Sequence, residues 1–239
     1  MEKKLMATID QFIVKVNLLL KEFLAAWTMY DVGRDAIDTI SNDVSIAPCV
    51  GYNQRVAPIP ILFIKQYKRQ YPHFILEVYQ NKLVQVWNGL LNDIFCLLLE
   101  EHMAGTRKFV ELKKQQIKVD FRSDEHLLVQ LKESCSKDFA FWEYDDRPKV
   151  INNVLNPDGK RQKELRNIRK HILIRNVIQH AGGIVNDYLL KELGSKEIIL
   201  KDKVGKQMSL KKDDKILLSI PELYDFLSCL LYVAQTWRG

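Results

Sequence analysis

The chain has 239 residues, 47% of them hydrophobic, so it can bury a substantial core as one domain or two small ones. Its formal net charge of +6 favours a polyanionic partner, and its four cysteines lack C-x-x-C spacing, which disfavours a disulfide framework or a cysteine metal site. Charges interrupt the apolar N-terminus, and the longest uncharged apolar run near the C-terminus, 226–234, is far shorter than the roughly 20 residues that span a bilayer. We therefore expect a protein of the reducing cytoplasm with no signal peptide and no membrane partner.

Two strong helices are predicted in the first half of the chain. Apolar residues at three- and four-residue spacing predict one helix over 3–30 and a second, very apolar core helix over 74–103. Prolines between them predict extended chain. We divide the chain there, into an N-terminal helical extension at 1–70 and a helical domain at 71–239.

The middle of the chain is less regular. Residues 107–118 form a basic amphipathic stretch, which we interpret as a solvated helix face in preference to an RNA groove. Ser123 starts a plausible N-terminal cap for a helix through Lys132. A short helix is predicted at 150–155, ended by the turn sequence at 156–159.

The last third of the chain carries the most informative pattern. Residues 161–193 read as one long helix, and the alternation of apolar and polar residues over 196–211 predicts a small β-hairpin. Ser219 is a plausible N-terminal cap for a final helix that reaches Trp237. The predicted fold class is therefore all-α, a helical bundle with a possible small β-hairpin near 196–211.

The predicted long helix contains the pattern R-N-x-x-x-H twice, at Arg166, Asn167 and His171 and again at Arg175, Asn176 and His180. The copies are nine residues apart, a half-turn offset on a helix, so they point to opposite sides. Asn176 falls within the arc of the apolar stripe, and Arg175 and His180 flank it. Asn167 and His171 fall away from the stripe, toward solvent. We therefore predict that the second copy forms the site and that the first is a basic surface.

Arginine, asparagine and histidine at this spacing suit cleavage of RNA without a metal. His180 can take the 2′-OH proton or protonate the leaving oxygen, and Arg175 can donate to the phosphate oxygens and stabilise their growing charge. Asn176 can orient the histidine or donate another hydrogen bond. One histidine does not readily serve on both sides of a phosphate, so we expect a homodimer that joins two copies of the helix. The alternative is a structural role for Arg175 and His180, because three fixed residues match by chance in about one chain in a hundred.

Residues 172–187, ILIRNVIQHAGGIVND, resemble the motif helix of the HEPN superfamily, whose mark is R-x4–6-H with a polar residue after the arginine. Residues 183–189 are similar to the segment that follows this motif in prokaryotic defence-associated members. The resemblance covers roughly 75–237, and it implies a helical, commonly homodimeric, metal-independent RNase that leaves a 2′,3′-cyclic phosphate. In this chain Arg175, Asn176 and His180 would be the catalytic residues.

The resemblance also implies a toxin–antitoxin or anti-phage setting with a regulatory or antitoxin protein as partner. A non-catalytic HEPN subunit that binds RNA or supports assembly is the alternative. Basic residues at the start of the motif helix would recruit RNA in a salt-dependent way, although a solvated helix end explains any one of them equally well. These residues are Lys160, Arg161, Lys163, Arg166, Arg169 and Lys170.

Other chemistries find little support in the sequence. It has no G-x-x-x-x-G-K-[ST] loop, and neither His102 nor His126 has a partner at metal-ligand spacing, so we expect no metal and no cofactor. Three acidic residues on the second predicted helix could reach the motif helix and orient Arg175 or His180. They are Asp93, Glu100 and Glu101.

Overall fold

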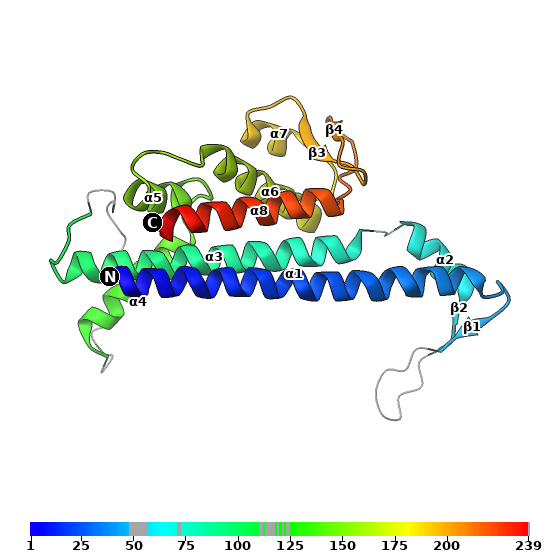
Figure 1. Cartoon of the computed structure of the whole chain (residues 1–239), viewed down its shortest axis with the longest axis horizontal. Coiled ribbons are helices and arrows are strands. Elements are labelled where there is room, and N and C mark those ends of the chain that lie inside the picture. Colours follow the sequence, from blue (N-terminus) through cyan, green and yellow to red (C-terminus); the bar gives the residue numbers. More distant parts are fainter. Residues whose placement is uncertain are drawn as a thin grey trace.

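The computed structural model describes residues 1–47, 57–70 (backbone only at 69–70), 73–109, 112, 118, 120, 122 and 125–238. Its two longest helices, α1 (Glu2–Thr39) and α3 (Phe74–Met103), lie side by side along the molecule (Figure 1). The predicted all-α class is confirmed. The other helices and strands of the described residues are β1 (Ser45–Ile46), β2 (Ile59–Pro60), α2 (Ile61–Gln70), α4 (Leu127–Ala140), α5 (Asp146–Leu155), α6 (Gln162–His180), α7 (Asp187–Leu193), β3 (Ile198–Lys201), β4 (Gln207–Leu210) and α8 (Ile220–Arg238).

The core forms where α1, α3 and α8 meet. Phe12 of α1 packs edge-on against Trp87 of α3, and Trp237 of α8 stacks on the same indole with ring centroids 5.3 Å apart. All three side chains are buried, so burying their large apolar surfaces ties the first helix to the last. The sequence boundary near residue 70 remains a prediction, although α1 contributes to the same core as the rest of the chain.

Helix α3 is the central element, as its wide apolar face predicts. By length and composition it is the one helix of the described residues that could cross a membrane, and half of its most apolar window is buried. Core helices of soluble proteins meet the same criterion. Helix α4 packs on α3 through Phe139 and Phe95, whose stacked rings have centroids 4.0 Å apart. The predicted cap at Ser123 and most of the basic stretch at 107–118 lie outside the described residues.

The predicted long helix over 161–193 is wrong. Helix α6 ends at His180, and Gly182 and Gly183 follow with φ of +63° and +71°. Such angles are readily adopted by glycine, so the pair turns the chain sharply before α7 begins. The turn is held by Ile216, whose backbone N–H donates to the Gly183 carbonyl at 2.8 Å.

The predicted hairpin and final helix are confirmed. Strands β3 and β4 pair antiparallel, with Ile198 opposite Leu210. The Ser219 hydroxyl accepts from the Glu222 backbone N–H at 3.1 Å, as expected of a cap at the start of α8. The hairpin lies beside the N-terminal end of α8, above the α1–α3 pair (Figure 1).

Candidate functional site

Arg175 is held on the half-buried side of α6 by two amide oxygens. Its Nε donates to Asn81 Oδ1 of α3 at 2.8 Å, and its Nη1 donates to Asn176 Oδ1 at 3.0 Å. A guanidinium has five N–H groups, so three remain for other acceptors. Arg175 and Asn176 are partly buried, whereas His180, the third residue of this copy, is exposed. This is an arginine with a fixed plane and spare donors, the arrangement that recognises a phosphate.

His180 is the last residue of α6 and is exposed. It lies four residues after Asn176, so the two side chains project from neighbouring turns of one helix face. The glycine turn that follows leaves the imidazole at a helix end, where a second molecule can approach it. The three predicted catalytic residues therefore share the C-terminal end of α6.

Two of the three acidic residues that could have oriented this group are engaged elsewhere. Glu100 pairs with Lys132 at 2.7 Å, and Glu101 lies 3.2 Å from the N-terminal amine, while Asp93 is exposed. The orienting group is Asn81, a neutral residue that is 94 positions away in sequence from Arg175. No sequence signal marks it, because its role depends on how α3 and α6 pack.

The prediction that Asn167 and His171 face solvent is wrong. His171 has 1% of its surface exposed, and its ring stacks on Phe226 of α8 with centroids 4.4 Å apart. Its Nδ1 lies 3.2 Å from Gln80 Nε2, an amide donor, so a neutral imidazole carries its proton on Nε2. A histidine buried in this way supports the fold and is out of reach of a substrate.

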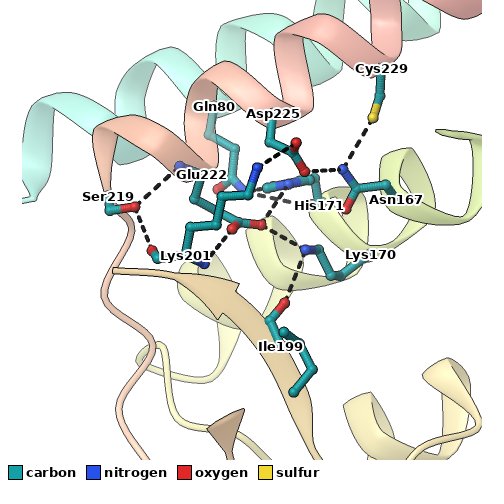
Figure 2. A network of polar contacts seen from close by, with 10 residues as sticks. All are labelled: Gln80, Asn167, Lys170, His171, Ile199, Lys201, Ser219, Glu222, Asp225 and Cys229. Carbon is teal, nitrogen blue, oxygen red and sulfur yellow. Dashed lines mark hydrogen bonds and ion pairs between the residues drawn. The ribbon is translucent and has the colours of Figure 1, made fainter. Parts of the chain in front are cut away.

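Glu222 is the centre of the buried polar network (Figure 2). Its Oε1 lies 2.6 Å from Lys170 Nζ and 3.1 Å from His171 Nε2, and its Oε2 accepts from the Lys201 backbone N–H at 2.6 Å. The His171 contact is close, but its geometry is not that of a hydrogen bond. The carboxylate thus joins α6, α8 and β3.

Burial and charge oppose one another at this network. Burial alone would raise the pKa of Glu222, but the contacts with His171 and Lys170 outweigh it and lower the pKa to about 2. Burial lowers the pKa of His171 despite its contact with Glu222. At neutral pH the network therefore contains an ionised glutamate and a neutral histidine.

A second set of contacts extends the network toward the surface. Asp225 accepts from Lys201 Nζ at 2.7 Å and from Asn167 Nδ2 at 2.9 Å. The same Asn167 amide donates to Cys229 Sγ at 3.2 Å, and burial raises the pKa of that thiol. Asn167 is thus a fixed, partly buried polar group between α6 and α8 (Figure 2).

The six predicted RNA-binding residues differ in whether a carboxylate pairs with them. Arg169 pairs with Asp145 and Glu192. Lys170 is neutralised by Glu222, as above. The two others that have carboxylate partners are Lys160, with Asp158, and Arg161, with Glu164. Lys163 and Arg166 are exposed and form no ion pair within the part of the chain that the structure describes.

No family model, curated protein or solved structure matches this chain. The HEPN resemblance therefore rests on the residues that carry it.

The described residues contain no group of three or more histidine, cysteine, aspartate or glutamate side chains that could hold a metal ion. What the end of α6 offers is a fixed cation and an exposed imidazole. An arginine of this kind can bind a phosphate and stabilise negative charge on it, and an imidazole can transfer a proton near neutral pH.

Proposed function

We propose that the protein is a metal-independent endoribonuclease of HEPN type. The observation that carries the proposal is the fixed Arg175 guanidinium, with three N–H groups free, on the same helix end as the exposed His180. The arrangement matches the roles that the sequence resemblance assigns to these residues.

The reaction begins when an imidazole takes the proton of a ribose 2′-OH, and the 2′ oxygen attacks the adjacent phosphorus. Arg175 donates to the phosphate oxygens, whose negative charge grows in the transition state. The bond from phosphorus to the 5′ oxygen breaks, and a second imidazole protonates that oxygen. The products are a 2′,3′-cyclic phosphate and a 5′-hydroxyl.

Two imidazoles are needed on opposite sides of the phosphate, and each chain supplies one at this helix end. A two-fold homodimer that joins the ends of two α6 helices provides both, together with two arginines. The setting we propose is cytoplasmic, as a toxin or anti-phage effector held in check by a partner protein.

The test is cleavage of mixed single-stranded RNA in EDTA by the wild-type protein and two variants. His180→Ala removes the proposed proton carrier, whereas Gln179→Ala alters its exposed neighbour and serves as the matched control. We expect cyclic phosphate ends from the wild type and from Gln179→Ala, and a loss of at least a hundredfold in His180→Ala. Equal rates in all three proteins would refute the proposal.

A non-catalytic RNA-binding subunit is the second candidate, and it is favoured by Lys163 and Arg166, which have no carboxylate partner among the described side chains. It predicts salt-dependent RNA binding by a wild-type protein that leaves the RNA intact. The same RNA samples, run on native and denaturing gels, separate the two functions.

A further inference from the structure

A groove of about 650 Å³ opens between α6, α8 and the β3–β4 hairpin. It lies on the side of α6 that carries the first R-N-x-x-x-H copy. The residues of α6 and α8 that face it and matter below are Lys163, Arg166, Asn167, Lys170, Ser228 and Tyr232. Its volume falls in the range of pockets that take one small ligand or a short piece of a polymer.

Four cations and four carboxylates line the groove, and two of the cations have no carboxylate partner among the described residues. Lys170 is neutralised by Glu222 and Lys201 by Asp225, so both serve the fold. Lys163 and Arg166 lie three residues apart on one face of α6, and neither has a carboxylate partner among the described side chains. Two adjacent exposed cations without carboxylate partners among the described residues favour a ligand with phosphate groups.

Other residues of α6 and α8 add polar and aromatic groups to the groove. Asn167 uses its amide N–H groups on Asp225 and Cys229, which fixes the side chain and leaves its carbonyl oxygen as an acceptor. Tyr232 on α8 is 48% exposed, and the Arg161 guanidinium lies 5.3 Å from the centre of its ring. Free cations beside an exposed aromatic ring are the combination that binds a single nucleic-acid strand, through phosphate contacts and base stacking.

A double helix does not suit this groove, because duplex RNA is recognised by shape across successive minor grooves. A single strand does, because its base, sugar and phosphate can enter separately.

We propose that this groove binds single-stranded RNA, with Lys163 and Arg166 on the phosphates and Tyr232 against a base. The inference rests on the proposed function in that it takes RNA as the substrate. It adds that recognition and cleavage lie on opposite faces of α6, because Arg166 and Arg175 are nine residues apart on one helix. The groove is thus a holding site, separate from the cleavage site.

Binding is measured in the His180→Ala background, so that cleavage does not enter, with a fluorescent 12-nucleotide RNA at 50–200 mM salt. The groove variant is Lys163→Gln with Arg166→Gln. The matched control, Lys3→Gln with Lys21→Gln, removes two exposed cations of α1. Tyr232→Leu tests the aromatic contact separately.

Losing two phosphate contacts makes the slope of log affinity against log salt shallower by about 1.4. The ratio of the parent protein's affinity to that of the groove variant therefore falls about sevenfold between 50 and 200 mM salt. Tyr232→Leu weakens binding about tenfold at every salt concentration. The control keeps the parent slope.

A groove variant that binds as the control does overturns the inference, as does equal binding of the matching duplex or no RNA binding at all. Cleavage by the wild type distinguishes the two ideas. If it cleaves RNA while the groove variant binds normally, the groove inference falls alone. If the groove binds RNA that is never cleaved, the enzyme proposal falls alone.

Discussion

Replacing Glu222 by glutamine tests whether the buried network stabilises the fold as its geometry indicates. The change preserves the shape of the side chain but removes its charge. Lys170 then loses its carboxylate, although it keeps the Ile199 carbonyl as an acceptor at 3.1 Å. Breaking a buried ion pair on one side costs about 3–5 kcal/mol, because the remaining charge is left uncompensated.

The pKa of Glu222 gives an independent magnitude. A fall from 4.5 to about 2 on folding corresponds to about 3 kcal/mol of stability at neutral pH. Because the folded pKa is the lower one, this contribution is present in full above pH 4.5 and is lost as pH falls toward 2. By linkage it shrinks to less than half of that at pH 3. His171, whose pKa is also lowered, adds a loss of stability as pH falls below 6.5.

The assay is urea unfolding followed by tryptophan fluorescence at pH 7, 5, 4 and 3. Trp87 and Trp237 are buried, so their emission reports the core. We expect the free energy of unfolding of the wild type to exceed that of Glu222→Gln by about 3 kcal/mol at pH 7 and by less than half of that at pH 3. Glu143→Gln, a change at an exposed glutamate, should stay within about 0.5 kcal/mol of the wild type. A constant difference between wild type and Glu222→Gln at every pH would refute the account of the network.

Two further predictions concern α3 and the end of α6. Asn81→Ala should slow RNA cleavage about tenfold by freeing Arg175, with little change in melting temperature. Asn81→Asp, which keeps the acceptor oxygen, should retain the cleavage rate. An equal loss of rate in both variants would show that Asn81 does not act by positioning Arg175. Gly182→Ala should destabilise the protein by about 1 kcal/mol because its φ is +63°. Gly89→Ala, in mid-helix with nothing within 4 Å of the added carbon, should stabilise the protein by about 0.5 kcal/mol. Thermal unfolding of the two glycine variants shows whether one is destabilised and the other stabilised.

Periodicity predicted the helices well because most of them bury one face. The predicted helix over 74–103 agrees with α3, and the hairpin over 196–211 contains β3 and β4. The first helix runs nine residues past its predicted end, to Thr39, where the apolar pattern weakens. The error at 181–186 has a local cause: positive φ at Gly182 and Gly183 ends the helix, which the spacing of apolar residues does not reveal.

The site was harder to predict than the fold. A wheel drawn from one apolar stripe assumes that a helix buries one face, but α6 packs against α3 and α8 together. Its buried arc runs from Ile168 through His171 to Ile174, so His171 falls inside it. The polar partners of the buried His171 ring are Gln80 and Glu222, which come from other helices. The spacing of residues on α6 therefore cannot predict them.

The two R-N-x-x-x-H copies therefore differ in environment for a physical reason. A histidine that transfers protons to a substrate must reach solvent, and His180 does, at a helix end without a buried carboxylate partner among the described residues. His171 lies beside an ionised glutamate and beneath Phe226, where exposing it would break the joint between α6, α8 and β3. The buried copy holds the helix in place from one side while Asn81 holds Arg175 from the other. A rigid α6 is what the proposed chemistry requires, because a phosphate clamp works only if its guanidinium keeps one orientation.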